Sequence, residues 1–410
     1  MFKLIYDLIV VGGGPSGIFT AINFKGKKIL LLEAESKLGK KLSLSGAGQC
    51  NITNDGDSKD FHGKYGDKDK FVKRLIRRFD NKSLMNFFTD AGLELTTKED
   101  GRVFPKSLIS NDVVSVLLSK LEDNKVEIKC NERVEAVRKI EDNFYSVKTN
   151  ENKYQAANVV IATGGCLFAK GSLKVDGFNM LKDLEHTIIE PVPALTSLHV
   201  NNHFLHSLSG VSLENASLTI WKNEKLVKRA EGDLLITHKG FSGPVVLNSS
   251  RYFHNNEQIK INFLGEKTNK NKLEEVIIRE SKISGKTKLA TFLNRLGISK
   301  NLTYAFLTES IIETDIRCSE IDKAKRKKIA KLICEYTISS FTSGGFEVAM
   351  ITAGGLALDQ VNMKTMESKQ AKGLYIVGEA LDLDGDTGGY NIQMAFTTGM
   401  IAAEDLNSKM

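Results

Sequence analysis

Apolar runs alternate with glycine-rich or polar loops along this chain. The runs are "YDLIVV" (6–11), "KKILLLEAE" (27–35), "AANVVIATGG" (156–165) and "GLYIVGEA" (373–380). Continuous apolar runs of this length predict strands that are buried on both faces, as in a parallel sheet. A helix-period pattern over 391–406 follows the last run, after a loop rich in glycine and acids. The pattern therefore predicts an α/β fold whose sheet takes strands from both chain ends.

Glycines follow the first run in the spacing of a dinucleotide-binding fingerprint. Gly12, Gly14 and Gly17 form G-x-G-x-x-G between a predicted strand and a predicted helix. The first glycine makes a tight turn, the second lets the backbone approach a pyrophosphate, and the third lets helix and strand pack closely. The second strand ends at Glu33, where a carboxylate is placed to accept a hydrogen bond from a ribose hydroxyl. This arrangement favours FAD or NAD over NADP.

Two further strand ends bear on the choice between FAD and NAD. One is followed by Gly164 and Gly165, and the other by the loop 378–389. In a doubly wound sheet such ends converge where ligands bind. FAD, stretched across the sheet, would use all of them. The loop would bring glycines and the N-terminus of the last helix to the flavin ring, where a helix dipole stabilises negative charge. The pattern therefore favours FAD.

The middle of the chain has a different pattern. After residues 190–200, apolar and polar residues alternate between turns, which predicts a small antiparallel sheet. The following region is rich in lysine and in helix-period patterns. We therefore predict a Rossmann-like FAD-binding domain built from both chain ends, with an inserted antiparallel β domain and a small helical subdomain. The predicted boundaries are 1–190 and 361–410 for the FAD-binding domain, 191–266 and 339–360 for the β domain, and 267–338 for the helical subdomain.

Composition is typical of a soluble globular protein. The chain has 410 residues, of which 41% are hydrophobic, and a formal charge of +7. A mild positive charge permits binding to nucleic acid but does not require it. The five cysteines are widely spaced and form no C-x-x-C pair, which predicts reduced thiols in a cytoplasmic protein. No apolar run is long enough to predict a membrane span.

The ordered motifs resemble one flavoprotein family over nearly the whole chain. The most specific motifs are "EAESKLGKKLSLSGAGQCNITN" (33–54) and "GLYIVGEALDLDGDTGGYNIQMAFTTG" (373–399). In these motifs the chain resembles the BaiN/RdsA-type, or YhiN-like, flavoproteins of the two-dinucleotide-binding-domain superfamily. The resemblance implies a tightly bound FAD. It also implies NAD(P)H as a reductant, which would dock transiently because the only complete dinucleotide fingerprint is taken by FAD.

The same resemblance implies which residues bind FAD. They are Gly12, Gly14, Ser16 and Gly17 at the pyrophosphate, Glu33 at the ribose, Lys41, Ser45 and Asn51 in the second motif, and Gly378, Glu379, Gly388, Gly389, Tyr390, Asn391 and Gln393 near the ribityl chain and ring. One departure is visible, because Gln49 stands where the family usually has an arginine. This departure bears on any role of that arginine in binding a substrate or an anion.

Cys50 is the candidate for acid–base chemistry. Its loop is expected to run close to the flavin, where a thiol could donate a proton to a carbon opposite the hydride face. The alternative is a small thiol packed in a glycine-rich loop. No metal site is predicted from either of two candidate groups. The acidic group lacks the spacing of an EF-hand loop, and the histidine group lacks both a helix pattern and a carboxylate partner. These two groups are Asp382, Asp384 and Asp386, and His199, His203 and His206.

Two basic clusters bear on the substrate, and each fits either a solvated helix face or a contact with a phosphate backbone. They are Lys70, Lys73, Arg74, Arg77 and Arg78, and Lys323, Lys325, Arg326, Lys327, Lys328 and Lys331. By resemblance, we predict NAD(P)H-dependent reduction of an activated carbon–carbon double bond, with uridine in ribosomal RNA as the leading substrate. The alternatives are an oxygen-using amine oxidase acting on an aminoacetone-like substrate, and an RNA-binding flavoprotein with structural FAD. The oligomeric state stays open.

Overall fold

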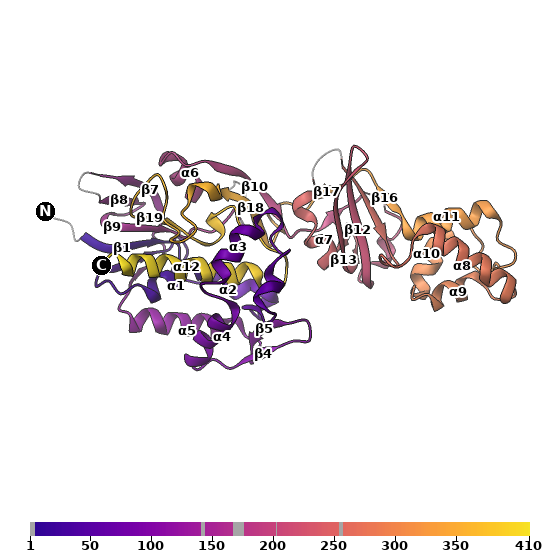
Figure 1. Cartoon of the computed structure of the whole chain (residues 1–410), viewed down its shortest axis with the longest axis horizontal. Coiled ribbons are helices and arrows are strands. Elements are labelled where there is room, and N and C mark those ends of the chain that lie inside the picture. The colour runs from indigo at the N-terminus through magenta and orange to yellow at the C-terminus, as the bar shows by residue number, and fades with distance from the viewer. Residues whose placement is uncertain (1–4, 141–143, 167–175, 202, 254–256) are drawn as a thin grey trace. The chain divides into compact units, whose positions relative to one another are not determined.

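Strands from both chain ends share one sheet in the computed structural model, which describes residues 5–140, 144–166, 176–201, 203–253 and 257–410. The strands before the fingerprint, before Glu33, before Gly164 and before Gly378 all run parallel (Figure 1). The sheet order is β6 (Glu127–Lys129), β2 (Ile29–Leu32), β1 (Ile5–Val11), β9 (Lys153–Ile161), β8 (Tyr145–Thr149) and β7 (Val134–Lys139), and β19 (Leu374–Ile376) also pairs with β9.

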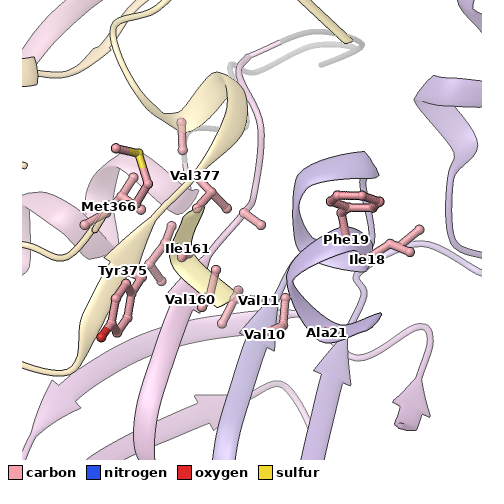
Figure 2. Close-up of a cluster of buried hydrophobic side chains, with 14 of the residues drawn as sticks. Val10, Val11, Ile18, Phe19, Ala21, Val160, Ile161, Met366, Tyr375 and Val377 are labelled. Atoms are coloured by element: carbon pink, nitrogen blue, oxygen red, sulfur yellow. The ribbon is translucent and has the colours of Figure 1, made fainter. Parts of the chain in front are cut away.

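The parallel strands form because their residues are apolar on both faces. All four residues of β2 and all three of β19 are buried. Helix α1 (Pro15–Asn23) covers the sheet with its apolar side, and α12 (Tyr390–Ser408) and α5 (Ser110–Asp123) pack against α1. Figure 2 shows part of this core, in which the labelled side chains come from β1, α1, β9 and the region of β19: Val10, Val11, Ile18, Phe19, Ala21, Val160, Ile161, Met366, Tyr375 and Val377.

Contacts divide the chain into two units, 1–192 with 351–410 and 193–350. The other elements of the first unit are short helices, a three-stranded sheet, and a strand pair formed by β10 and β18. They are α2 (Lys40–Leu44), α3 (Asp69–Ile76), α4 (Asn81–Asp90), α6 (Asp176–Asp183), β3 (Thr53–Asn54), β4 (Leu95–Thr97), β5 (Arg102–Pro105), β10 (Ile188–Ala194, whose last two residues belong to the second unit) and β18 (Ile351–Leu356).

The second unit combines an antiparallel sheet with helices. Its strands, in sheet order, are β16 (Tyr336–Ile338), β15 (Glu257–Asn262), β12 (Ser212–Lys222), β13 (Lys225–Thr237), β14 (Gly240–Ser242), β11 (Leu198–His199) and β17 (Thr342–Ser343). Its helices are α7 (Pro244–Leu247), α8 (Lys270–Ile283), α9 (Leu289–Arg295), α10 (Lys300–Glu309) and α11 (Lys323–Cys334).

One hydrophobic core joins the sheet and the helices of the second unit. The rings of Phe263, after β15, and Phe306, on α10, lie 5.1 Å apart. The regions predicted as a β domain and a helical subdomain therefore share one core. Residues 351–360 of the predicted β domain fall in the first unit, where Leu356 forms a β-bridge with Leu381. That pairing is long-range, so the apolar pattern of this segment does not disclose it.

Candidate functional site

The loops after the parallel strands meet at one edge of the sheet. A Cβ placed on Gly12, after β1, would lie 2.4 Å from the carbonyl oxygen of Ala162, after β9. A Cβ placed on Gly378, after β19, would lie 2.5 Å from Oγ of Ser16 at the start of α1. The fingerprint loop is therefore packed against the ends of two strands that are distant in sequence. This edge is where doubly wound sheets bind their ligands.

The three fingerprint glycines have different surroundings. A Cβ on Gly17 would lie 2.1 Å from the Gly12 carbonyl oxygen, so helix and strand pack too closely for a side chain there. No atom of the described residues, apart from its two chain neighbours, lies within 4 Å of a Cβ placed on Gly14. Helix α1 begins next to this space with Pro15, and no side chain caps its N-terminus. Open space at an uncapped helix N-terminus fits a pyrophosphate, as FAD requires.

Glu33 lies beside the fingerprint. Its carboxylate accepts hydrogen bonds from the backbone N–H of Gly13 at 2.7 Å and of Glu35 at 2.8 Å. These bonds fix the carboxylate between the loop after β1 and the loop after β2. A carboxylate oxygen can accept more than one hydrogen bond, so the group can still bind a ribose hydroxyl. The position and chemistry of Glu33 fit the adenosine ribose of FAD.

An ion pair connects α2 with the loop after β19. The Lys41 ammonium donates to the Glu379 carboxylate, whose other oxygen accepts from the backbone N–H of Thr352 at 2.8 Å. The Thr352 hydroxyl in turn accepts from the backbone N–H of Cys166 at 2.8 Å. Gly165 is next to this group, because an added Cβ would lie 2.3 Å from the Thr352 hydroxyl oxygen and 2.7 Å from Oε1 of Glu379, and Gly164 precedes it with φ +71°. Of the predicted residues, Lys41, Glu379 and Gly164 are thus brought to one place.

The segment after α2 has an unusual backbone. Gly46, Ala47, Gly48 and Cys50 all have positive φ, between +57° and +84°. Positive φ at a non-glycine residue is strained, and such residues cluster at binding sites. Ser45 is occupied locally, because its hydroxyl donates to the Leu42 carbonyl at 2.7 Å. Two strained non-glycine residues, Ala47 and Cys50, therefore lie in the motif that the resemblance assigns to the flavin.

Asn51, at the end of this segment, provides a second observation. Its Oδ1 atom is buried and has no hydrogen-bond partner among the residues that the structure describes. Buried polar atoms in native proteins nearly always have a partner, so Oδ1 of Asn51 is available to accept a hydrogen bond from a group outside the described residues. Its position fits a donor group of a bound ligand.

Cys50 lies inside the protein. The residue is fully buried, and burial raises the pKa of its thiol to about 12. A thiol with this pKa is a weaker acid than a free cysteine. The geometry favours the packed-thiol interpretation, and the general-acid role stays a prediction.

The last motif builds a loop and a helix start. A Cβ on Gly389 would lie 2.6 Å from the Thr53 backbone, so this glycine allows α12 to approach β3. Asn391 accepts from the backbone N–H of Gly385 at 2.7 Å and donates to the carbonyl of the same residue at 2.8 Å. Gln393 is fully buried and accepts from the Thr53 hydroxyl at 2.6 Å. The side chains of Asn391 and Gln393 are therefore used inside the protein.

The other two predicted residues of this motif shape the loop. The Tyr390 ring packs edge-on against Phe61, with centroids 5.1 Å apart, and is mostly buried. A Cβ on Gly388 would lie 2.8 Å from the Tyr390 ring. The contacts of these residues with a flavin stay predictions.

Comparison with known proteins gives the family. Residues 6–405 match the family model described as "HI0933-like protein Rossmann domain". The chain belongs to this family. It is 30% identical over 410 residues to the 3-dehydro-bile acid delta(4,6)-reductase of Clostridium scindens, covering 96% of this chain and 97% of that one. It is 28% identical over 402 residues to the ribosomal RNA dihydrouridine synthase of Haemophilus influenzae, with the same coverage, and 25% identical over 404 residues to that of Escherichia coli, covering 98% of both.

Membership of the HI0933-like family confirms the predicted Rossmann-like α/β fold. The chain is an FAD-dependent oxidoreductase. Two features at the sheet edge fit this cofactor, the open space at Gly14 and the fixed carboxylate of Glu33. A third lies in the segment after α2, where Oδ1 of Asn51 has no partner among the described residues.

Two residues at this edge were missed by the sequence argument. Thr352 links Glu379 to the loop after β9, and Lys68 forms an ion pair with the buried Asp382 at 2.5 Å. The pairing of Asp382 with a lysine explains one member of the acidic group without a metal. The only sequence signal near Thr352 was the glycine pair Gly354 and Gly355, which in the structure lies inside β18 and not after it.

The three histidines grouped in the sequence, His199, His203 and His206, each have a ring nitrogen within hydrogen-bond distance of a protein group. His203 Nε2 lies 3.1 Å from the Thr237 carbonyl, and His199 Nε2 lies 2.9 Å from the Ser197 hydroxyl. Across the described ranges, no group of three or more His, Cys, Asp or Glu side chains is placed to hold a metal ion. Among the helices in those ranges, none is both long and apolar enough to span a membrane.

Proposed function

We propose that this enzyme uses NAD(P)H to reduce an activated carbon–carbon double bond, and that its substrate is uridine in ribosomal RNA. The observation that carries the proposal is the agreement between full-length relatives. Two are named ribosomal RNA dihydrouridine synthases and one a bile acid reductase, and each aligns with at least 96% of this chain. Uridine and a 3-oxo steroid with a double bond at position 4 both contain a double bond conjugated to a carbonyl. One site chemistry therefore serves both named activities.

The proposed reaction transfers one hydride and one proton to the substrate. NAD(P)H and the proton reduce the 5,6 double bond of uridine, giving NAD(P)⁺ and dihydrouridine. FAD, when bound, supplies hydride-transfer chemistry between the nicotinamide and the substrate. With a single dinucleotide fingerprint in the chain, NAD(P)H would bind transiently rather than in a second Rossmann site.

The residues of the sheet edge act by binding and orientation. The N-terminus of α1 would hold the pyrophosphate, and Glu33 the ribose. The Lys41–Glu379 pair and Thr352 fix α2, the start of β18 and the loops after β9 and β19 relative to one another. A rigid arrangement of these loops holds reacting groups in place, which is the main contribution of a protein to cofactor chemistry.

The test is the dihydrouridine content of ribosomal RNA, measured by mass spectrometry of its nucleosides. A strain that lacks the gene should lose dihydrouridine, and the wild-type gene should restore it. A gene carrying Gly14→Ala, which fills the space expected to hold the pyrophosphate, should not. Unchanged ribosomal RNA in the deletion strain would contradict the proposal. Peroxide release with aminoacetone in the absence of NAD(P)H would instead indicate an amine oxidase.

A further inference from the structure

A groove in the second unit carries charge that the flavin site does not use. It is a cavity of about 460 Å³ formed by β15, α10, α11 and β16. The charged and aromatic side chains that line it are Lys260, Glu309, Lys328, Lys331, Glu335 and Tyr336.

The lining of the groove has a small positive excess, because three lysines, Lys260, Lys328 and Lys331, face two glutamates, Glu309 and Glu335. Glu335 accepts from Lys260 at 3.0 Å and also from Lys270 at 2.5 Å, so its negative charge is already compensated twice. Lys328 and Lys331 are exposed and form no ion pair with any residue in the described part of the chain. Two lysines are therefore available at this groove to bind an anion.

Helix α11 extends this positive surface. Its sequence, "KAKRKKIAKLIC", has six basic residues and no acid, and its buried face is made by apolar residues and Cys334. Lys323 and Lys325 lie in the first turn, where the helix dipole disfavours cations. Lys323, Lys327 and Lys331 follow one another at four-residue intervals, where like charges repel. The first-turn lysines and the lysines at four-residue intervals both destabilise the helix, so helix stability does not explain why lysines occupy these positions.

An aromatic side chain lies beside the groove. Trp221, on β12, is paired with Gln258 of β15, which lines the groove, and the Lys260 ammonium lies 5.1 Å from the Trp221 ring. The indole N–H donates to the Thr219 hydroxyl at 2.9 Å, which fixes the ring, and Trp221 is partly exposed. A basic groove next to a fixed aromatic ring is the arrangement with which proteins bind single-stranded nucleic acid, through phosphates and base stacking.

We propose that this groove, with α11 and Trp221, binds a single-stranded segment of RNA. Lys328 and Lys331 contact phosphates, and Trp221 stacks on a base. An aromatic ring beside the lysines favours RNA over an acidic protein, which would need charge alone. The inference rests on the proposed function, because it assigns to the second unit the binding of the RNA substrate. Contacts with phosphates and base faces do not distinguish one base from another, so the groove increases affinity for RNA but does not select uridine.

The test measures binding of the FAD-loaded enzyme to a fluorescently labelled, uridine-containing single-stranded RNA by anisotropy, over a series of salt concentrations. Replacing both lysines, Lys328→Ala with Lys331→Ala, should weaken binding roughly tenfold and lower the salt slope by about 0.7 for each phosphate that is no longer neutralised. The control is Lys282→Ala with Lys286→Ala, which removes the same charge from exposed positions of the same unit outside the groove. It should change binding by less than about twofold.

Trp221 is tested separately from charge. Trp221→Leu should weaken binding about fivefold or more with little change in the salt slope, and Trp221→Phe should retain most of the affinity. FAD content and melting temperature identify any variant that fails to fold.

Three outcomes would overturn the proposal that the groove binds RNA. They are a wild-type enzyme that does not bind RNA, an equal loss of RNA affinity in the control double variant, or competition by polyglutamate as strong as that by unlabelled RNA. The last would indicate an acidic protein partner. Failure of the proposed function is a separate result. If RNA binds through the groove as described but ribosomal RNA gains no dihydrouridine, the groove stands and the proposed reaction does not.

Discussion

Replacing Gly14 by alanine separates cofactor binding from folding in the first unit. Gly14 has φ −81° and ψ 178°, which any residue adopts, and within the described part of the chain an added Cβ meets no atom within 4 Å beyond its chain neighbours. The substitution reduces the freedom of the unfolded chain, which stabilises by about 0.4–1 kcal/mol, while alanine is a poorer helix N-cap than glycine. We therefore expect the FAD-free variant to differ from the wild type by less than about 1 kcal/mol.

The effect on FAD is expected to be much larger. The new methyl group would occupy the space at the N-terminus of α1 that the pyrophosphate requires. At an FAD concentration one hundred times Kd, binding stabilises the wild type by about 2.7 kcal/mol. For a unit of this size each kcal/mol corresponds to a change in Tm of about 2–4 °C, so FAD should raise the wild-type Tm by about 5–11 °C. The variant should lose nearly all of this increase.

Thermal unfolding followed by circular dichroism, with and without FAD, makes the comparison. Gly17→Ala is the matched control, because its Cβ would lie 2.1 Å from the Gly12 carbonyl oxygen and should lower Tm without FAD. The reasoning is refuted if FAD stabilises Gly14→Ala as it does the wild type. It is also refuted if Gly14→Ala and Gly17→Ala lower the FAD-free Tm equally.

Three further predictions concern single buried or bonded groups. Glu33→Gln places an amide donor against the backbone N–H of Gly13 or Glu35, so it should lower the free energy of unfolding by about 1–3 kcal/mol. It should also lower the amount of FAD that the protein retains on gel filtration. The control Glu99→Gln, at an exposed position, should change neither quantity. Because burial raises the pKa of the Cys50 thiol to about 12, iodoacetamide should label Cys50 only after unfolding. The Cys50→Ala variant should have a lower Tm but retain turnover. Loss of turnover at an unchanged Tm would instead support a general-acid role. Burial lowers the pKa of His186 below its usual value, so protonation of this residue favours the unfolded state and the free energy of unfolding should fall as the pH falls through the range below about 6.5. The fall should be less steep for His186→Gln, and an equal pH dependence would contradict this assignment.

Local chemistry made the parallel sheet and the fingerprint predictable from sequence. A run such as "ILLL" is buried on both faces wherever it pairs, and the glycine spacing before α1 has one common structural use. Long-range pairing was not predictable in the same way. Lys68 and Asp382 are separated by 314 residues, and only the folded chain shows that they form an ion pair.

Side-chain direction was the second limit. The resemblance placed Asn391 and Gln393 near the flavin, but a motif does not specify whether an amide faces a ligand or the protein. In the structure both amides bond to protein groups, among them Gly385 and Thr53. Asn51 was named on the same basis and has a buried oxygen without a partner among the described residues. Three residues of one predicted set therefore have different surroundings.

Reduction of the bound flavin by nicotinamide is the most direct test of the account. The purified, FAD-loaded enzyme is kept free of oxygen, NADH and NADPH are added separately, and the visible absorbance of the oxidised flavin is followed. We expect one of the two to bleach it rapidly, and uridine-containing ribosomal RNA to restore it. Bleaching by neither nicotinamide, together with bleaching by aminoacetone or another small amine, would contradict the reductase and indicate an oxidase.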